Sequence, residues 1–535
     1  MEHRSGMSRT HRWAHLSYAL LLSLTFLPQA EVDAESPESQ RSDSEDLNVQ
    51  RPNVIFVLAD DLGIGDIQPT NSECKIATPN LAKLAKQGIT FTDAHSSSSV
   101  CTPTRYGLLT GRYNWRSRLA RGVLSGTSPH LIPESRATVG HLMKRAGYHT
   151  QMIGKWHLGW DWSYENQQTE GKRRIDFKLP ITNGPDINGF DGYYAHCGSL
   201  DMPPYVWVDT GKATAIPVRE EGVTKQQDRY GWYRKGPIAP DFKIDEVLPH
   251  LFGKSMQYVK DRTSESETNQ PFFLYLALPA PHTPIVPVPP FKDASGLNPY
   301  ADFVMQVDHH IGELLETLEQ QGVRENTLFV FSSDNGCSPE ANFALLAQHD
   351  HHPSAGFRGH KADIYEGGHR VPLLASWPAV ISPGQKTAEL ACLTDFYATL
   401  ADLTGQAKKD GGEDSHSWLP LFQGKEGYTR TDLISHSIGG FFSYRRDGWK
   451  LCLSAGSGGW SQPREADAAK QKLPPIQLFD LKSDPAEQIN LQMEQGEKVK
   501  ELIEELTKQV RAGRSTPGPA TSNDREVEFL PRSLQ

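Results

Sequence analysis

The chain has 535 residues, of which 37% are hydrophobic and 22% charged, and a formal net charge of −10. This length allows two or more domains, and the acidic balance argues against a general nucleic-acid-binding protein, which would be basic overall. The six cysteines are widely spaced without a CxxC pair, so the sequence predicts neither a disulfide scaffold nor a zinc ribbon.

The N-terminal region has the features of an export signal. Arginines precede an apolar stretch over residues 16–27, and Val32-Asp33-Ala34 offers a small-residue cleavage site. We expect a signal peptide over 1–34, followed by an acidic, serine-rich linker over 35–50. No later stretch is long and apolar enough to span a membrane, and no Asn-x-Ser/Thr sequon occurs. We therefore expect an exported bacterial protein, periplasmic or secreted, with no membrane span in its mature form.

Residues 51–425 alternate between continuous apolar runs and amphipathic helices. The apolar runs are PNVIFVLADD from residue 52, YHTQMIGKWH from 148, PFFLYLALPAPH from 271 and TLFVFSSDN from 327. Helices are indicated by Thr78, Pro79 and Gly88 around the first, and by apolar residues at helical spacing over 304–318. This alternation predicts an α/β fold with a large, mostly parallel central sheet sandwiched by helices.

Each of these predicted strands ends in polar or ionisable residues. In chain order they are Asp60, Asp61, Lys155, His157, His282, Asp334 and Asn335. Taken singly, each has an ordinary explanation as a turn aspartate, a solvated lysine or a loop histidine. In open α/β sheets, however, ligands bind beyond the carboxyl ends of the strands. The coincidence therefore predicts an active site at this edge of the sheet.

Residues 426–535 follow a different pattern. The stretches FFSYRRDGWKLCLS and IQLFDLKSDPAEQINL predict strands joined by turns. The stretch EKVKELIEELTKQVRAG places its apolar residues on one helical face and ends at Gly513. We expect a smaller C-terminal α+β domain with an antiparallel sheet, a packing helix and a loose tail.

The stretch SSSSVCTPTRYGLLTGR over 96–112 places one cysteine at the start of a predicted helix. Pro103 suits the first turn of a helix, and Arg105, four residues after Cys101, lies on the same helical face. The positive end of a helix beside a guanidinium stabilises an anion. From these residues alone, Cys101 is either a structural thiol or a thiolate nucleophile.

The stretch CTPTRYGLLTGR resembles the signature of the formylglycine-dependent sulfatases. PNVIFVLADDLGIGD, GKWHLG, PHTP, SSDNG and GHKADIYEGG stand in the order of that family, so the resemblance extends from residue 52 to the C-terminus. Thr102 and Thr104 stand where serine is commoner. The resemblance implies an alkaline-phosphatase-like fold, a catalytic domain over 51–425, and hydrolysis of sulfate monoesters. It further implies a sulfated sugar or an aryl sulfate as substrate, with the sulfated sugar favoured.

The resemblance also implies roles for individual residues. Cys101 is expected to be oxidised to formylglycine by a formylglycine-generating enzyme or an anaerobic maturase, and the hydrated aldehyde then attacks sulfur. Oxygen ligands suit Ca²⁺, or alternatively Mg²⁺, and the expected ligands are Asp60, Asp61, residue 101, Asp334 and Asn335. Arg105, Lys155 and Lys361 are expected to surround the sulfate. His157 is expected to deprotonate the second hydroxyl, and His282, helped by Lys361, to protonate the leaving oxygen.

Further stretches leave two interpretations open. A run of basic residues either receives a second anionic group or is a solvated face; it comprises Arg112, Arg116, Arg118 and Arg121. QHDHHP over 348–353 either binds a metal or forms a loop at the rim of the pocket. Three residues of the loop CGSLDMPPYVWVD either contact a sugar or pack within the loop; they are Asp201, Tyr205 and Trp207.

Two other functions compete with a sulfatase. A phosphate or phosphonate ester hydrolase of the same superfamily is the alternative, because related folds host both chemistries. A non-catalytic sugar-binding protein would have lost part of the charged set, and no position of that set is missing.

Overall fold

The computed structural model describes residues 51–165, 173–224, 229–264, 270–408, 411–531 and 534. The predicted signal peptide over 1–34 and the acidic linker over 35–50 lie outside the described residues. Within the described ranges, no helix has the length and apolar character needed to cross a bilayer.

A ten-stranded sheet forms the centre of the fold, in the order β13-β2-β12-β11-β1-β10-β4-β5-β6-β7. Its strands are β1 (Asn53–Ala59), β2 (Ile89–Phe91), β4 (His149–Lys155), β5 (Gly192–His196), β6 (Val208–Asp209), β7 (Lys212–Ala213), β10 (Phe272–Ala277), β11 (Thr327–Ser333), β12 (Leu373–Ser376) and β13 (Gln385–Thr387). The strands from β11 to β5 are mutually parallel, and antiparallel pairs flank them. The predicted large, mostly parallel sheet is confirmed.

The four strands predicted from their apolar runs are direct neighbours. They are β11, β1, β10 and β4, at the centre of the sheet. Nearly every residue in them is buried, which explains why β1, β10 and β11 are largely apolar rather than alternating. β4 (HTQMIGK) is mostly buried but carries several polar residues. Because these strands are adjacent and parallel, the polar residues that follow them meet at one edge.

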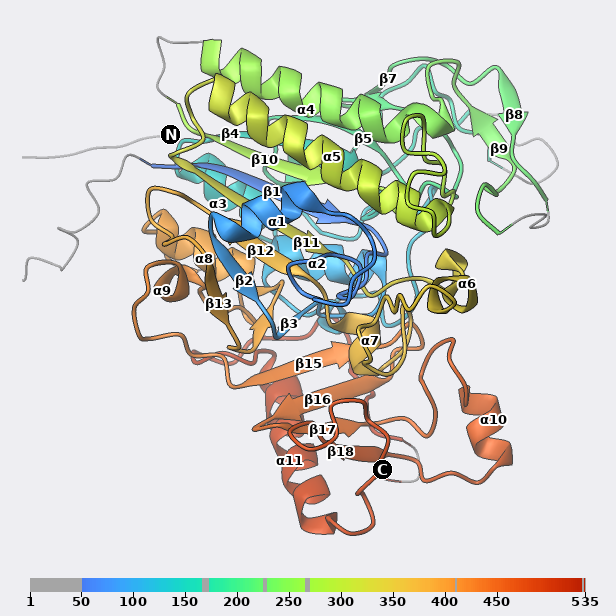
Figure 1. The fold of residues 1–535 in the computed structure, drawn as a ribbon, viewed down its shortest axis with the longest axis vertical. Helices are drawn as coiled ribbons and strands as arrows, with labels where there is room; N and C mark the ends of the chain where they lie inside the picture. The colour runs from blue at the N-terminus through green and yellow to red at the C-terminus, as the bar shows by residue number, and fades with distance from the viewer. Residues whose placement is uncertain are drawn as a thin grey trace, which may run out of the picture. The chain divides into compact units, whose positions relative to one another are not determined.

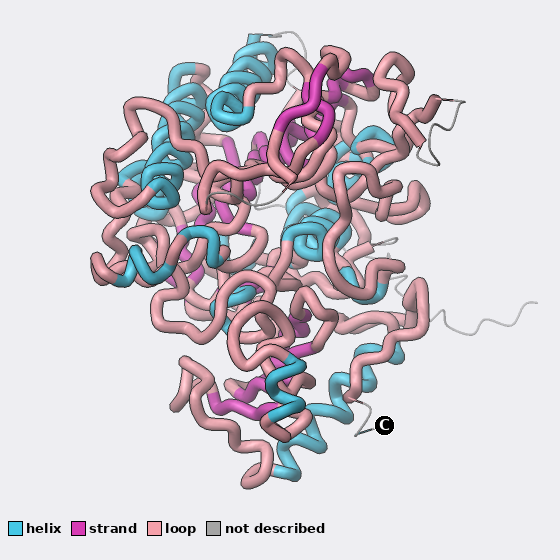
Figure 2. Tube along the Cα trace, turned by 90° about the vertical axis from the view of Figure 1, so that its right-hand side faces the viewer, coloured by secondary structure: helices cyan, strands magenta, loops and turns pink. Residues whose placement is uncertain are grey.

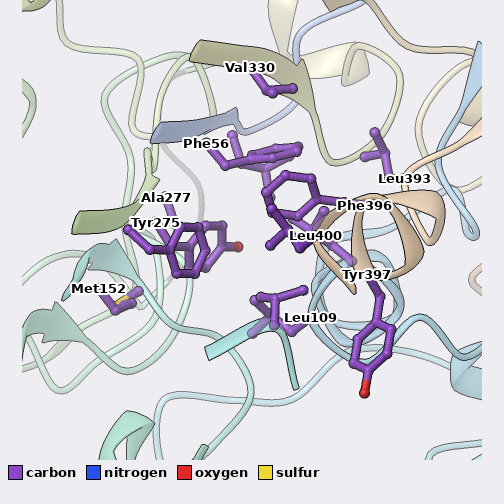
Figure 3. Close-up of a cluster of buried hydrophobic side chains, with 14 of the residues drawn as sticks. Phe56, Leu109, Met152, Tyr275, Ala277, Val330, Leu393, Phe396, Tyr397 and Leu400 are labelled. Atoms are coloured by element: carbon purple, nitrogen blue, oxygen red, sulfur yellow. The ribbon is translucent and has the colours of Figure 1, made fainter. Parts of the chain in front are cut away.

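Helices cover both faces of this sheet (Figure 1). On one face lie α1 (Pro79–Lys86), α4 (Val247–Ser264) and α5 (Pro299–Gln320), and on the other α2 (Cys101–Thr110), α3 (Val139–Arg145) and α8 (Asp395–Leu403). Successive residues of β1 point to opposite faces, so Ile55 joins the core beneath α4 and α5 while Phe56 joins the other. Figure 3 shows Phe56 of this second core facing Phe396 and Leu400 of α8.

Helix α1 begins and ends where the sequence indicates. Gly88 follows it, but this glycine is needed for packing against a neighbouring strand rather than for ending the helix. The helix runs from Pro79 to Lys86, with Gln87 as its C-cap. A β-carbon on Gly88 would lie 2.0 Å from the carbonyl oxygen of Ala375 in β12. The glycine is therefore needed for the close approach of β12.

A separate antiparallel sheet forms the C-terminal region (Figure 1). It contains β15 (Asp432–His436), β16 (Phe442–Arg446), β17 (Trp449–Cys452) and β18 (Gln477–Asp480), and α11 (Gly496–Ala512) packs against it. The β16–β17 turn has positive φ at Asp447 and Gly448, as tight hairpins require. The predicted α+β arrangement is confirmed, with β15 as an additional strand.

The C-terminal tail differs from the loose segment expected. The backbone N–H of Thr521 donates to Ala512, and the Asn523 side chain donates to the carbonyl of Val510 at the end of α11. Asp524 accepts a hydrogen bond from Arg112 at 3.0 Å. These contacts anchor residues 521–524 to both the α11 end and the segment after α2.

The remaining elements are short. They are β3 (Ala94–His95), β8 (Arg219–Glu221), β9 (Gly236–Ile238), β14 (Ala391–Cys392), α6 (Phe343–Ala347), α7 (Glu366–His369), α9 (Leu419–Phe422), α10 (Glu465–Lys470) and four 3₁₀ turns at Asn114–Arg116, Pro185–Asn188, Ile244–Glu246 and Pro339–Ala341. The side that carries β8, β9, α6 and α10 consists largely of loops (Figure 2).

Candidate active site

The residues that follow the central strands converge on Cys101. Cys101 is the first residue of α2, and its Sγ lies 3.5 Å from Oδ1 of Asp60. Potential ligand atoms of Asp60, Asp61, Cys101 and His282 all lie within 4.8 Å of one another. The site is thus assembled from the ends of β1 and β10 and the N-terminus of α2.

Three buried carboxylates are matched by three cationic side chains. Lys155 Nζ donates to Asp60 Oδ2 at 2.5 Å, and Lys361 Nζ lies 2.7 Å from Asp61 Oδ1. The Arg105 guanidinium donates through Nε and Nη2 to Asp334 Oδ2, at 3.0 and 2.8 Å. Each carboxylate therefore has a cationic partner, as buried charges require.

The pKa values of the two strand-end aspartates that contact Arg105 are shifted in opposite directions. Burial alone would raise the pKa of Asp60, but Lys155, His282 and Arg105 hold it well below its ordinary value. Burial and the neighbouring Asp60 raise the pKa of Asp334 to about 6. Asp60 is accordingly the permanent anion of the pair.

The environment of Cys101 disfavours a thiolate. Burial and the nearby Asp334 raise the pKa of the Cys101 thiol well above its ordinary value, despite Lys155 and Lys361. Nucleophilic cysteines have lowered pKa values. Of the two interpretations that the residues alone left open for Cys101, the raised pKa disfavours the thiolate nucleophile and is compatible with a structural thiol.

His157 is held as a neutral imidazole with one free nitrogen. Its Nε2 donates to the carbonyl oxygen of Leu124 at 2.8 Å, and its buried Nδ1 has no hydrogen-bond partner among the described residues. Burial and Lys155 lower its pKa well below the ordinary value. A fixed tautomer with an unpaired Nδ1 is suited to accept a proton.

Ser199 belongs to the same cluster, although the sequence analysis did not identify it. Its Oγ accepts a hydrogen bond from Lys155 Nζ at 3.1 Å and lies 3.2 Å from Nε2 of His282. Ser199 follows β5, the fifth strand of the parallel set. Recognising GYYAH as a strand would have directed attention to the polar residues after it.

The donor set fits a hard divalent cation. Asp60, Asp61, Asp334 and Asn335 offer oxygen atoms, which Ca²⁺ and Mg²⁺ prefer. Asn335 Nδ2 donates to Asp61 Oδ1 at 2.7 Å, whereas its buried Oδ1 has no hydrogen-bond partner in the described structure. An unpaired buried acceptor is costly, and coordination of a cation would satisfy it.

The basic run after α2 does not provide a second anion site at Arg112 and Arg116. Both side chains are buried. Arg112 pairs with Asp524, and Arg116 pairs with Asp414 through two hydrogen bonds of 2.9 Å. These acids could not be identified from the basic run itself, because they lie 412 and 298 residues further along the chain.

The loop residues considered for sugar contacts are packed inside. Tyr205 and Trp207 are each 1% exposed, and the Trp207 ring lies 4.5 Å from that of Phe242. Asp201 is buried and pairs with Arg234. This burial matches the packed-loop alternative, and a sugar contact by these three residues stays a prediction.

In the histidine-rich stretch over 348–353, one histidine contacts a neighbouring loop. His351 is buried, and its Nε2 lies 2.8 Å from Oδ1 of Asp66 in the loop after β1. No residue of this stretch belongs to a potential metal-binding group found among the described residues. The structure therefore favours the loop interpretation.

Comparisons with known proteins agree with this geometry. The family profile described as Sulfatase matches residues 52–406. An N-acetylgalactosamine-6-O-sulfatase from Bacteroides thetaiotaomicron is 31% identical over 86% of this chain and 93% of its own length. Human arylsulfatase A is 32% identical, covering 82% and 83%.

A solved structure points the same way. It comes from work on a glycosaminoglycan-metabolism locus of Bacteroides thetaiotaomicron, and superposes with a TM-score of 0.73 at 29% identity, covering 86% of this chain and 99% of that one. Together with the family profile and the named relatives, which are sulfuric ester hydrolases, this similarity shows that the chain belongs to the sulfatase family.

Proposed function

We propose that this protein hydrolyses sulfate monoesters with a formylglycine formed from Cys101 and a bound divalent cation. The observation that carries the proposal is the position of Cys101. It begins α2 with its Sγ 3.5 Å from Asp60, in a cluster of oxygen donors and cations, yet its environment suppresses the thiolate. A residue so placed is explained if its thiol is only the precursor of the reactive group.

Two groups supply chemistry that the unmodified side chains lack. A hydrated formylglycine supplies a hydroxyl nucleophile for covalent catalysis. A divalent cation supplies Lewis acidity toward a sulfate oxygen, and Asp60, Asp61, Asp334 and Asn335 would hold it. We favour Ca²⁺ over Mg²⁺, because the family resemblance points to calcium.

The cationic side chains of the site bind and stabilise the sulfate. Arg105, Lys155 and Lys361 converge on the carboxylates beside Cys101, so they lie where negative charge develops on the transferred group. Donors fixed in advance at such a place are typically worth about 3 kcal/mol each toward the transition state.

Two histidines move protons. His157 accepts one at Nδ1, since Nε2 is committed to the Leu124 carbonyl. His282 lies 3.7 Å from Asp61 and close to Ser199, and we assign it, with Lys361, to protonation of the leaving oxygen. General acid–base catalysis of this kind contributes about 10²–10⁴-fold.

The proposed substrate is the 6-sulfate of a galactose-type residue in a sulfated carbohydrate. Two relatives named for N-acetylgalactosamine-6-sulfate, one bacterial and one human, support this class. Export of the protein and its maturation by a formylglycine-generating enzyme or an anaerobic maturase complete the proposal. The N-terminal export signal supports the first, and the CTPTR sequence supports the second.

Paired assays test the proposed function. Wild-type protein, Cys101→Ala and the matched control Cys74→Ala would be given an aryl sulfate and an aryl phosphonate. We expect the wild type and Cys74→Ala to cleave the sulfate, and Cys101→Ala to lose this activity. Retained activity in Cys101→Ala, or faster cleavage of the phosphonate by the wild type, would contradict the proposal.

A further inference from the structure

A groove of about 710 Å³ lies among the loops beside the active site. Its volume is in the range of ligand-binding clefts. Three segments wall it, namely residues 173–178, residues 216–220 and the Pro203-Pro204 turn, and Thr127 contributes at one end. None of these residues has a role in the proposed mechanism.

Two loops connect this groove directly to the catalytic cluster. Leu124, whose carbonyl holds His157, stands three residues before Thr127, so the two α-carbons are at most about 11 Å apart. On the other side, Ser199 contacts Lys155 and begins the turn that leads to Pro203. The loops touch, because a β-carbon on Gly126 would lie 2.2 Å from the Pro203 carbonyl oxygen. The groove is therefore a continuation of the site.

The groove carries exposed cations on a chain that is acidic overall. Arg173, Arg174 and Lys178 are exposed and line the groove, and none of them forms an ion pair with another described residue. Of the acids at its edge, Glu220 pairs with Lys235, and Asp176 accepts the backbone N–H of Lys178. That hydrogen bond leaves the Asp176 carboxylate charged, so Asp176 and Glu165 are two acids without a cationic partner among the described residues, against three such cations.

The walls between these cations are apolar. Ile175, Phe177, Pro203 and Val218 all line the groove, and Val218 is 76% exposed. Apolar surfaces framed by a few charged groups suit a ligand that has both nonpolar C–H faces and anionic substituents. A small aryl sulfate held at Cys101 would not need such an extension, whereas a sulfated polysaccharide has both features along its length.

We propose that this groove binds the sulfated sugar residues that adjoin the one being desulfated. The inference rests on the proposed function, and it identifies the substrate as a polymer rather than a monosaccharide. Arg173, Arg174 and Lys178 pair with sulfate or carboxylate groups of the chain, and the apolar walls contact its sugar rings.

The test is Arg173→Ala/Arg174→Ala/Lys178→Ala, measured on a 6-sulfated chondroitin polymer and on the monosaccharide N-acetylgalactosamine 6-sulfate. The matched control is Lys86→Ala/Lys260→Ala/Lys386→Ala, which removes the same charge from exposed positions outside the groove. Loss of three exposed ion pairs predicts a fall in kcat/KM on the polymer of about tenfold. The monosaccharide rate should stay within about twofold in both variants, because the catalytic residues are unchanged.

The salt dependence of the rate on the polymer is a second test of the groove. Added NaCl should slow the wild type on the polymer more steeply than it slows the groove variant, because exposed charges are screened. An unchanged polymer rate in the groove variant, or an equal loss on polymer and monosaccharide, would overturn the proposal. If the wild type cleaves no sulfate at all, the proposed function fails instead. Binding of the polymer to Cys101→Ala protein, compared with and without the groove substitutions, then still tests whether the groove binds the polymer.

Discussion

Single residues in this site take their chemistry from their surroundings more than from their type. Cys101 is kept protonated by burial and Asp334, in a place where a thiolate nucleophile would need the opposite shift. His157 is fixed in one tautomer by a single carbonyl. Asn335 directs its nitrogen at Asp61 and leaves its oxygen unpaired. Each of these features follows from folding and cannot be read from the residue name.

Replacing His157 tests its assignment as a base. His157→Ala should lower kcat on an aryl sulfate by about 10²–10⁴-fold, with a smaller change in KM, because the imidazole moves a proton and the cations bind the sulfate. His309→Ala, which removes a half-exposed histidine of α5, should leave kcat unchanged. Steady-state kinetics would check both, and wild-type kcat in His157→Ala would exclude His157 as the base.

The unpaired oxygen of Asn335 predicts stabilisation by a divalent cation. Ca²⁺ at about 100 times its Kd should add about 2.7 kcal/mol to the free energy of unfolding of the wild type, since it binds only the folded site. Asn335→Leu, which removes the oxygen, should need more Ca²⁺ for the same rise in Tm. Asn335→Asp, which keeps an oxygen ligand, is the control. Identical Ca²⁺ responses in wild type and Asn335→Leu would contradict this assignment.

At the scale of elements, the segment that carries Lys361 is held between the two sheets. The Lys361 backbone N–H donates to Cys337, and the Glu366 N–H donates to Glu487 of the C-terminal region at 2.7 Å. Lys450 of β17 pairs with both Glu366 and Glu487. The C-terminal sheet therefore helps to position Lys361, which we propose stabilises the sulfate.

One group of potential metal-binding side chains in this network contacts the protein's own cationic side chains instead. His95, Glu366 and His369 lie close enough together to hold an ion. However, Lys450 Nζ lies 3.1 Å from His369 Nε2, and Arg445 Nη1 lies 3.0 Å from His95 Nε2. The cluster is a buried ion network that joins the two sheets.

This network predicts a pH-dependent stability. Burial and Glu366 raise the pKa of Glu487 to about 7 despite Lys450, above the value of about 4.3 expected in the unfolded chain. Between these values the folded state binds more protons, so this group's contribution to stability is present at low pH and is lost as pH rises through about 7.

Replacing Glu487 with a neutral analogue checks the sign. The free energy of unfolding of Glu487→Gln, relative to wild type, should increase from pH 5 to pH 8, as followed by denaturant unfolding. Glu497→Gln, at an exposed position of α11, should differ from wild type by a constant amount. A constant difference for Glu487→Gln as well would contradict the predicted titration.

The strands also show which parts of the fold can be predicted from the sequence alone. β1, β10 and β11 are buried on both faces, so each is a largely apolar run that can be recognised without a structure, whereas β4 (HTQMIGK) is mostly buried but mixes polar with apolar residues. β5 and β15 were not predicted, since GYYAH and DLISH are short and mix polar with apolar residues. Residues that follow the recognised strands, such as Asp60, could therefore be predicted, whereas Ser199, which follows β5, could not. The roles of Cys101, Arg105 and Lys361 were predicted from the family resemblance.

At the scale of the whole described molecule, the described residues from 51 onward belong to one compact unit. The strands of the two sheets come from separate parts of the sequence, 53–387 and 432–480, but ion pairs tie the parts together. Lys450 of β17 forms a buried pair with Glu366 of α7, and the C-terminal tail supplies Asp524 to Arg112, just after α2. The C-terminal region is therefore coupled to the helix that presents Cys101.

The buried Arg116–Asp414 pair predicts a large loss of stability when it is broken. Both side chains are fully buried, so Asp414→Ala leaves an uncompensated guanidinium and should cost about 3–5 kcal/mol. Asp524→Ala, whose carboxylate is 38% exposed, should cost about 1 kcal/mol or less. Thermal and denaturant unfolding would measure the loss in free energy of unfolding of both variants. Equal losses would contradict the prediction that burial sets the cost of breaking each pair.

If residue 101 acts as formylglycine, the mass of the tryptic peptide 87–105 shows it, and this mass is the first measurement to make. The protein would be produced together with a formylglycine-generating enzyme, assayed on an aryl sulfate and then digested. Active preparations should contain the aldehyde at residue 101, and activity should rise with the fraction of protein that carries it. A fully active preparation with unmodified cysteine at residue 101 would contradict this prediction.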